Sequence, residues 1–233
     1  MKNYELDILM PVHNEEKIIP DLLSRIHNNI NGKISYRLII CEDGSSDNSV
    51  KVLKSLQEKF PITLITNKNK RGYSLAMLEG IKNSKADYLL MMDSDGQSNP
   101  DEILNFWKNK NKANIICGNR FERNDYMYRK LYSKLAFNLY KVLFNLKIKD
   151  PSYAYVLTEK KVYQKLSNFK PEMPDGFFWE FNARAAKQGF NFHNIDVVHN
   201  KRQYGETRIY SLKNLPKVTF YNLVGLLKVR FSK

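Results

Sequence analysis

The stretch "YLLMMDSDGQSNPDE" (residues 88–102) runs from an apolar segment directly into two carboxylates, Asp93 and Asp95, that are one residue apart. Gly96 follows them, so the backbone can turn sharply at this point. A D-x-D pair before a glycine is common in ordinary acidic turns. The same pattern also allows two carboxylates to converge on one cation, and the rest of the chain has to separate these interpretations.

The sequence around this stretch predicts an α/β fold with a mostly parallel sheet. Short apolar runs predict strands at 6–11, 36–43, 62–66, 87–93 and 114–119. Most runs are continuous rather than alternating, which is typical of strands that are covered on both faces. Apolar residues at helical spacing lie between the first three runs. Such a βα succession predicts right-handed crossovers and a ligand site at the carboxyl ends of the strands.

The acidic residues fall at those ends. Glu42 and Asp43 close the second predicted strand, and Asp93 and Asp95 close the fourth.

The second half of the chain is less regular. We predict a long apolar helix at 128–148, a strand at 152–158, a helix at 176–189 that ends at Gly189, and a late strand at 190–200.

The composition is globular but strongly basic. The 233 residues are 42% hydrophobic and 27% charged, with a net charge of +14. This charge indicates an anionic partner, which could be nucleic acid, an anionic lipid surface or a phosphorylated substrate. A solvated lysine-rich surface is the alternative. No recognised nucleic-acid motif is present, so we expect no nucleic-acid partner.

The two cysteines predict a reducing compartment. Cys41 and Cys117 lie inside apolar runs and are expected to be buried thiols rather than a disulfide or a zinc pair. The start, "MKNYELDILMP", carries charges within any apolar core, so we expect no signal peptide.

The chemistry of the acidic turn favours a hard divalent cation. Oxygen ligands suit Mg²⁺ or Mn²⁺, which bind through one or two carboxylates plus substrate phosphates. Gln97 offers a further neutral oxygen. Zinc is not expected, because no His or Cys lies near this turn in the sequence. A metal-bound diphosphate is therefore the expected ligand, with the cation stabilising a leaving phosphate.

An ordered set of motifs identifies a family resemblance. "MPVHNEEKII", "ICEDGSSDNSV", "NKRGYSLAMLEGI", "MMDSDGQSNPDEI" and "RQYGETR" follow one another between positions 10 and 208. This series resembles the inverting family 2 glycosyltransferases, especially dolichyl-phosphate (polyprenyl-phosphate) mannose synthases. The resemblance implies the GT-A fold of nucleotide-diphospho-sugar transferases. We accordingly expect a catalytic domain over 1–207 and a basic C-terminal segment over 208–233.

The resemblance also implies roles on the donor side. It places Pro11, His13 and Glu15 in a nucleotide-contacting turn, although the family often has Tyr where His13 stands. Glu42 and Asp43 would contact base and ribose, and Glu42 replaces the commoner Asp. Arg71 would approach the nucleotide, and Asp93, Asp95 and Gln97 would form the metal and diphosphate site. Arg202 would contact the diphosphate and close the site.

On the acceptor side, the resemblance implies a phosphate held by Arg129 and Ser133, with help from Arg120 and Arg208. Arg129 and Ser133 share one helix face at i and i+4, and guanidinium forks match phosphate geometry. A hydroxyl acceptor needs a general base, whereas a phosphomonoester is already an anion at pH 7. Sugar-acceptor relatives often show Glu-Asp where this chain has "FFWEF", which leaves Glu180 as the one carboxylate of that segment. We therefore expect a polyprenyl phosphate acceptor, with a sugar hydroxyl as the alternative.

A polyprenyl acceptor requires contact with a membrane. No segment has the ~18–20 uninterrupted apolar residues of a spanning helix. The run at 218–233 is shorter and contains Lys228, Arg230 and Lys233, which favours a helix in the membrane interface over packing on the protein's own core. Packing is favoured for the long helix at 131–148. We expect a cytoplasmic, peripheral enzyme on the inner face of a membrane, or one that relies on a membrane-protein partner.

Overall fold

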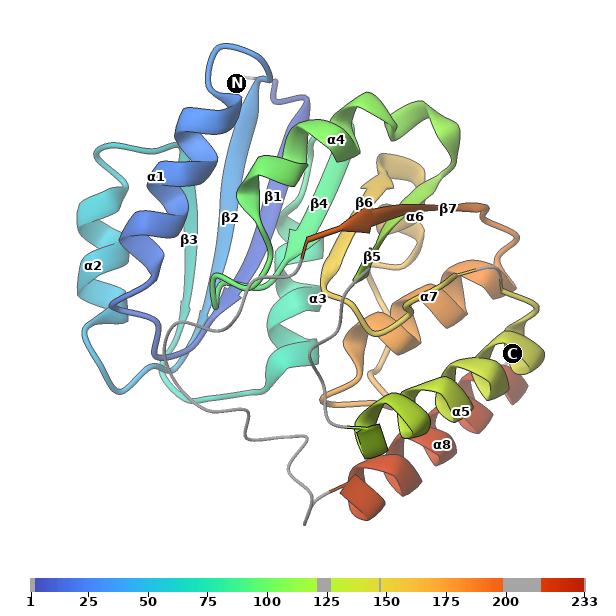
Figure 1. The fold of residues 1–233 in the computed structure, drawn as a ribbon. Helices are drawn as coiled ribbons and strands as arrows, with labels where there is room; N and C mark the ends of the chain where they lie inside the picture. Colours follow the sequence, from blue (N-terminus) through green and yellow to red (C-terminus); the bar gives the residue numbers. More distant parts are fainter. Residues whose placement is uncertain (1–2, 121–126, 147, 199–214, 233) are drawn as a thin grey trace.

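A computed structural model of the protein describes residues 3–120, 127–146, 148–198 and 215–232, without the side chains of 127–135 and 215–219. Within these residues seven strands form one sheet in the order β3-β2-β1-β4-β6-β5-β7 (Figure 1). The strands are β1 Leu6–Val12, β2 Tyr36–Asp43, β3 Ile62–Asn67, β4 Tyr88–Met92, β5 Ile115–Arg120, β6 Tyr155–Glu159 and β7 Phe192–Val197.

The sheet is mostly parallel, as predicted. β1 pairs in parallel with β2 and β4, β2 pairs in parallel with β3, and β5 pairs in parallel with β7. β6 is antiparallel to both of its neighbours, β4 and β5. The register pairs Met92 with Tyr155, so the segment that precedes β6 lies beside the carboxyl end of β4.

Helices cover both faces of the sheet. They are α1 Ile19–Ile30, α2 Ser49–Leu56, α3 Tyr73–Asn83, α4 Ile103–Lys108, α5 Met127–Phe144, α6 Lys160–Lys165, α7 Phe177–Lys187 and α8 Leu215–Phe231, with short 3₁₀ turns at Pro100–Glu102 and Lys110–Lys112. The α5 and α8 helices lie side by side at the outside of the molecule (Figure 1).

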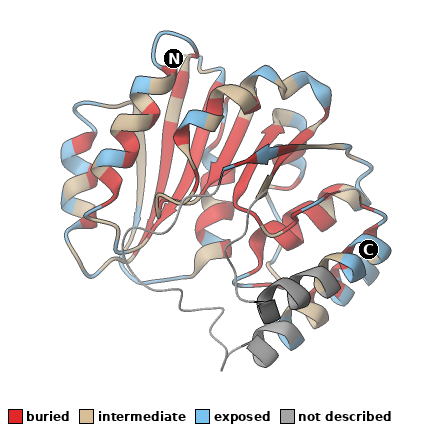
Figure 2. Cartoon of the chain, in the orientation of Figure 1, coloured by how far each residue is buried: buried red, intermediate tan, exposed pale blue. Residues whose placement is uncertain are grey.

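Two apolar cores result, one on each face of the sheet. In β1, Leu9 joins the core under α3 and α7, while its neighbours Ile8 and Met10 join the core under α1. This alternation follows from the two-residue period of a strand. Because both faces are covered, the central strands are buried along their length (Figure 2). Continuous apolar runs in the sequence are the consequence.

The predicted elements are confirmed, with shifted boundaries in the second half. The long helix ends at Phe144 rather than at 148, because Asn145 has a positive φ of 49° and the chain turns there. The strand predicted at 152–158 begins only at Tyr155, since residues 150–154 form a turn that carries polar contacts. The α7 helix ends next to Gly189, whose φ of 80° suits a helix terminus.

The cysteines and the membrane expectation can also be compared with the structure. Cys41 and Cys117 are buried free thiols, as predicted. Across the described ranges, none of the helices combines the length and the apolar character needed to cross a bilayer. For the C-terminal run, the sequence favoured a helix in the membrane interface over packing on the protein's own core. The structure shows that one face of α8 does pack on α7.

Candidate active site

The turn after β4 holds Asp93 and Asp95 on either side of a buried serine. The Ser94 hydroxyl donates to the Pro11 carbonyl at 2.7 Å, which fixes the turn to the end of β1. Gly96 has a φ of 76°, and the Asp95 carboxylate accepts the Gln97 backbone N–H at 3.0 Å. Both carboxylates remain half-buried and lie at the carboxyl ends of β1 and β4. The pair is therefore held at the sheet edge where parallel α/β folds bind ligands.

Tyr73 orients the first of these carboxylates. Its hydroxyl donates to Asp93 Oδ1 at 2.6 Å, although Tyr73 is the first residue of α3 and lies twenty positions earlier in the chain. Burial, and then the neighbouring charge of Asp93, raise the pKa of Tyr73 well above its ordinary value. The hydroxyl thus stays protonated and remains a hydrogen-bond donor.

The donor set fits a Mg²⁺ or Mn²⁺ ion that also binds substrate. In the described part of the chain, no three His, Cys, Asp or Glu side chains gather into a closed metal cage. Asp93 and Asp95 supply two carboxylates, and an ion bound by one or two protein carboxylates completes its shell with water and phosphate oxygens. The pair therefore matches a metal–diphosphate site better than a structural cation site.

The acidic pair at the end of β2 organises two loops. The Asp43 carboxylate accepts the backbone N–H groups of Arg71 and Gly72, each at 2.8 Å, and Glu42 accepts the N–H of Ser45. Both acids are buried. Gly72 has a φ of 103°, which an L side chain rarely adopts, and this lets the loop present both N–H groups to Asp43. Contacts of Glu42 and Asp43 with base and ribose stay a prediction.

The other residues predicted on the donor side surround this loop. His13 Nδ1 lies 3.0 Å from the Asp43 carbonyl oxygen, and the Glu15 backbone N–H donates to Ser49 Oγ at 2.9 Å. The Arg71 guanidinium forms an ion pair with Glu79 of α3. The fold therefore brings the ends of β1, β2 and β4 and the start of α3 to one edge.

Arg120, predicted to help bind the acceptor phosphate, lies in a polar cluster at the end of β5. Its guanidinium donates to both oxygens of Asp150, at 2.7 and 3.1 Å, and to Ser152 Oγ at 3.0 Å, and it lies over the Tyr153 ring. Asp150 is buried. The ion pair holds Arg120 beside the antiparallel β6, and a contact with phosphate remains a prediction.

The remaining predicted acceptor residues are placed only in part. Arg129 and Ser133 belong to α5 and lie one turn apart, but the structure does not describe their side chains. Arg202 and Arg208 lie outside the described residues. Their roles stay predictions.

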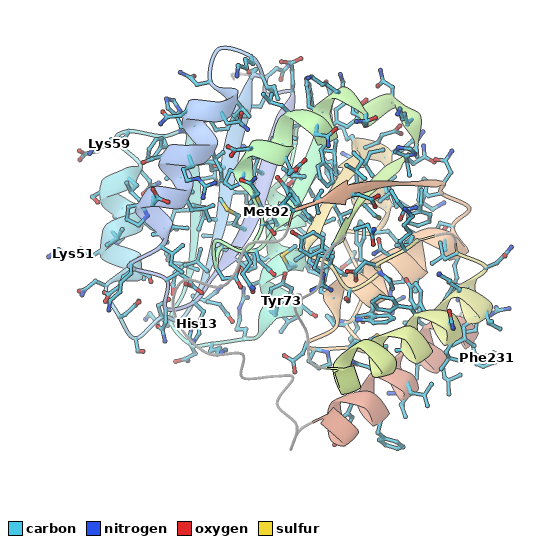
Figure 3. All side chains as sticks on the ribbon, in the orientation of Figure 1. His13, Lys51, Lys59, Tyr73, Met92 and Phe231 are labelled. Atoms are coloured by element: carbon cyan, nitrogen blue, oxygen red, sulfur yellow. The ribbon has the colours of Figure 1, made fainter. Side chains whose placement is uncertain are left out.

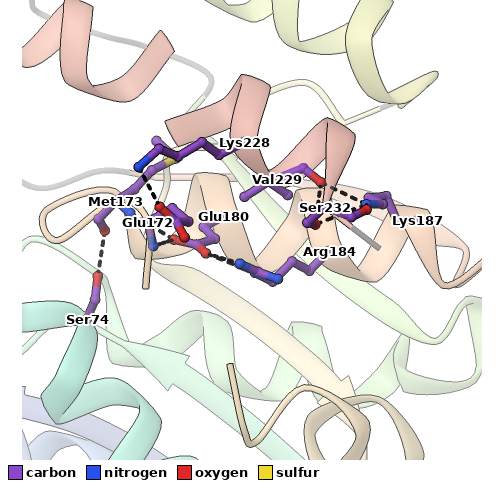
Figure 4. Close-up of polar contacts among 9 residues, drawn as sticks. All are labelled: Ser74, Glu172, Met173, Glu180, Arg184, Lys187, Lys228, Val229 and Ser232. Atoms are coloured by element: carbon purple, nitrogen blue, oxygen red, sulfur yellow. Dashed lines mark hydrogen bonds and ion pairs between the residues drawn. The ribbon is translucent and has the colours of Figure 1, made fainter. Parts of the chain in front are cut away.

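Glu180 has a structural environment. It is fully buried in α7, where Oε2 accepts the backbone N–H groups of Glu172 and Met173 at 2.8 and 2.9 Å. Oε1 accepts two hydrogen bonds from Arg184, at 2.9 and 2.7 Å (Figure 4). Four hydrogen bonds to one carboxylate fix the 172–173 backbone, so Glu180 is poorly suited to take a proton from a substrate.

Sequence reasoning missed Tyr73, Asp150 and Tyr153. Tyr73 stands in a quoted motif, but nothing in its spacing reveals a contact with Asp93. Asp150 could have been suggested by the surplus of arginines near 120, because a buried guanidinium requires a carboxylate partner. Tyr153 lies in the turn before the antiparallel strand β6 and accepts a hydrogen bond from Ser98 at 3.3 Å. No sequence pattern predicts this position.

Comparison of the fold with solved structures defines the class. The chain superposes on a mannosyltransferase from Pyrobaculum calidifontis, in complex with GDP-Man and Mn²⁺, with a TM-score of 0.70 at 13% identity, covering 100% of this chain and 66% of that one. Glucosyl-3-phosphoglycerate synthase from Mycobacterium tuberculosis, in complex with Mn²⁺, UDP and phosphoglyceric acid, gives 0.70 at 13% identity, covering 99% and 80%. The fold is therefore GT-A.

The sequence comparison then gives the family. The model of glycosyl transferase family 2 matches residues 7–167, and the chain belongs to this family of enzymes. A dolichol-phosphate mannosyltransferase of Pyrococcus furiosus is 29% identical over 168 residues, which is 69% of this chain and 47% of that protein. An undecaprenyl-phosphate 4-deoxy-4-formamido-L-arabinose transferase of Shewanella sediminis is 29% identical over 95% of this chain and 66% of its own length. The chain thus spans 47% to 66% of these two curated relatives.

Proposed function

We propose that this chain is a metal-dependent transferase that moves a hexose from a nucleotide-diphosphate sugar to a polyprenyl phosphate, with inversion. The observation that carries the proposal is the pair Asp93 and Asp95, fixed by Ser94 and Tyr73 at the carboxyl edge of a GT-A sheet. The names of the relatives, which specify dolichol phosphate and undecaprenyl phosphate, support the lipid acceptor.

On the donor side, Asp93, Asp95 and Gln97 would hold Mg²⁺ or Mn²⁺. When bound, the ion supplies neutralisation of the charge that develops on the leaving diphosphate. Pro11, His13 and Glu15 would frame the nucleotide together with Glu42, Asp43 and Arg71. The hexose is expected to be mannose or glucose, with GDP-mannose as the first donor to test.

On the acceptor side, Arg129, Ser133, Arg120 and Arg208 would bind the phosphate of the lipid. A phosphomonoester has a second pKa of roughly 6 and is an anion at pH 7, so it attacks without a general base. The environment of Glu180 supports a phosphate acceptor. Glu180 is the carboxylate that would serve as general base for a hydroxyl acceptor, and it already accepts four hydrogen bonds within the protein.

The reaction would be one in-line displacement. An oxygen of the acceptor phosphate forms a bond to the anomeric carbon while the bond from that carbon to the nucleotide diphosphate breaks, and the configuration inverts. No proton has to move. Arginines and the correct alignment of the two phosphates would supply most of the acceleration, and Arg202 would close over the donor diphosphate. Such an enzyme would work peripherally at the cytoplasmic face of a membrane, alone or with a membrane-protein partner.

One assay tests this proposal. Purified protein is incubated with labelled GDP- or UDP-hexoses, a short polyprenyl phosphate, and Mg²⁺ or Mn²⁺. We expect an acid-labile, solvent-extractable lipid product of inverted configuration, and no product with EDTA or without acceptor. Absence of lipid product with every donor, together with transfer to a sugar hydroxyl, would overturn the acceptor assignment and support a role in polysaccharide synthesis.

A further inference from the structure

The inner face of α8 is committed to packing against the body of the protein. Leu226 and Val229 are buried in the same core as α7. Gly225 permits the close approach, because a Cβ at this position would lie 2.5 Å from Met173 Cγ and 3.2 Å from the Glu172 carbonyl oxygen. Only a residue without a side chain fits there.

Polar contacts fix the helix at two further points. Lys228 pairs with Glu172 at 3.0 Å, and Lys187 of α7 donates to the carbonyls of Val229 and Ser232 at 2.8 and 2.6 Å (Figure 4). Lys187 thereby satisfies carbonyl groups at the end of α8 that have no partner within the helix. The helix is therefore held in one orientation, and its outer face is defined.

That outer face is apolar and largely exposed, with Val224 half-buried. Phe220, Val224, Leu227 and Phe231 recur at i, i+4, i+7 and i+11, which places them in one stripe. Phe220 is 63% exposed and Phe231 is 78% exposed, values expected of polar residues. We call these four residues the outer stripe. Of the described side chains of α8, the protein's own core buries Leu226 and Val229 and leaves the residues of the outer stripe outside it.

The neighbouring helix extends the apolar character. The α5 helix contacts α8, and its Leu139 and Val142 are exposed, Val142 at 81%. The other face of α5 is buried, since Tyr140 packs against Trp179 of α7. Two adjacent helices thus each present apolar side chains to solvent. Large exposed apolar side chains gathered on neighbouring elements mark interaction sites with proteins or membranes.

The charge beside the stripe selects the occupant. Among the described cations of α8, Lys228 pairs with Glu172 while Arg230 is exposed, and the whole chain carries +14. Exposed Arg230 lies with its guanidinium 6.0 Å from the centre of the Phe231 ring, next to the stripe. A second copy of this chain would bring equal positive charge against this face. An anionic bilayer offers both an apolar layer and opposite charge.

We propose that the outer stripe of α8, flanked by Arg230 and extended by Leu139 and Val142, docks this protein on an anionic lipid bilayer, with α8 lying in the plane of the interface. The inference deepens the proposed function and rests on it for the lipid nature of the acceptor. The docking itself requires neither donor nor acceptor.

Co-sedimentation with vesicles tests the docking. We expect the wild type to bind phosphatidylcholine vesicles that contain phosphatidylglycerol, and to bind more weakly to phosphatidylcholine alone. Phe220→Gln combined with Phe231→Gln should lower binding at least tenfold, since each buried aromatic side chain contributes roughly a tenfold factor or more. Val198→Gln removes an equally exposed apolar side chain from the end of β7 and should bind as the wild type does.

A second pair of variants tests the charge. Arg230→Gln should lower binding about fivefold at low salt, and the loss should shrink as salt is added. Lys51→Gln removes one positive charge from exposed α2, at the far side of the molecule from Phe231 (Figure 3), and should have no effect. Equal binding by the wild type and the double phenylalanine variant would overturn the proposal. The proposal would also be overturned if the wild type forms a dimer and binds no vesicles, while the double phenylalanine variant is a monomer.

Turnover separates this inference from the proposed function. The double variant should keep wild-type turnover on a short, water-soluble acceptor and lose turnover on a long-chain acceptor embedded in vesicles. Vesicle binding as expected, with no transfer to either acceptor by the wild type, would leave the docking supported and overturn the proposed function. Transfer by a wild type that does not bind vesicles would overturn the docking alone.

Discussion

The Tyr73 hydroxyl donates a hydrogen bond of 2.6 Å to the Asp93 carboxylate and so connects the start of α3 to the turn after β4. The next residue, Ser74, donates to the carbonyls of Met173 and Pro174 at 2.9 and 2.7 Å. The carboxylate turn is therefore connected through α3 to the segment on which α8 packs. This arrangement makes Tyr73 a positioning residue for Asp93.

We expect Tyr73→Phe to lower kcat/KM by roughly ten- to a hundredfold, because a hydrogen bond to a charged group contributes about 1.5–3 kcal/mol. The dependence of turnover on Mn²⁺ concentration should shift to higher concentrations, since Asp93, a proposed metal ligand, loses its orientation. Titration of the metal in the transferase assay measures both effects.

The matched control is Tyr88→Phe. Tyr88 donates to Asn111 at 3.1 Å in an exposed contact, so the same chemical change there should leave kcat/KM and the metal dependence unchanged. A Tyr73→Phe enzyme with wild-type metal dependence and turnover would show that Asp93 needs no such orientation.

Asp95→Asn should abolish turnover and leave the fold intact. The substitution keeps the shape of the side chain and an acceptor for the Gln97 N–H, but it removes the charge that a divalent ion requires. Thermal unfolding with a panel of nucleotides, with and without Mn²⁺, provides the measurement. The metal-dependent stabilisation by nucleotide should disappear while the Tm without ligand stays the same.

Asp101→Asn is the control for this change, because Asp101 is an exposed partner in a 3.9 Å surface ion pair with Arg25. It should keep the metal-dependent stabilisation. Full activity in Asp95→Asn would count decisively against a metal site at this turn.

Glu180→Gln separates a structural carboxylate from a catalytic one. Removing its charge leaves the mostly buried Arg184 without its ion-pair partner, which costs about 3–5 kcal/mol for a buried pair. We expect a marked fall in Tm, whereas turnover per folded molecule should stay within a few-fold of the wild type. Urea unfolding and active-site-normalised kinetics measure the two quantities.

The control is Glu172→Gln, at the rim of the same cluster, where the partner Lys228 is largely exposed and little stability should be lost. A stable Glu180→Gln protein whose turnover falls by several orders of magnitude, with the loss confined to a hydroxyl acceptor, would instead identify Glu180 as a general base.

The sheet could be predicted because strands that are buried on both faces have continuous apolar sequences. Strand β4, for example, is an unbroken apolar run that ends at a charged turn. The antiparallel direction of β6 was not predictable, because an apolar run of five residues has the same pattern in either direction. The late start of β6 follows from Asp150 and Ser152, whose side chains bind Arg120 from a turn.

The site was predictable only where residues follow strand ends. Asp43, Asp93 and Asp95 lie at the predicted strand ends, since topology alone brings those ends together, and their roles in binding stay predictions. Tyr73 and Asp150 act through contacts between distant segments, and no periodicity records such contacts. The outer stripe of α8 shows the same limit: apolar residues occur on opposite faces of this helix, and its packing on α7 decides which of these faces lies toward solvent.

Stability at high pH should depend on Tyr153, which lies beneath the Arg120 guanidinium. Burial raises the pKa of Tyr153 from 10.0 to about 12. Between these values the unfolded chain has lost the phenolic proton while the folded chain retains it. The stabilising contribution is therefore complete below pH 10 and is lost as the pH rises toward the folded value, up to about 3 kcal/mol for this group.

Tyr153→Phe has no proton to lose, so its free energy of unfolding should fall less steeply than that of the wild type between pH ~10 and ~12. Urea unfolding across this range measures both slopes. Tyr221→Phe is the control, because Tyr221 is 58% exposed; it should keep the wild-type slope. Equal slopes for Tyr153→Phe and the wild type would mean that the Tyr153 hydroxyl is hydrated in the folded protein, and that the cluster around Arg120 is open to water.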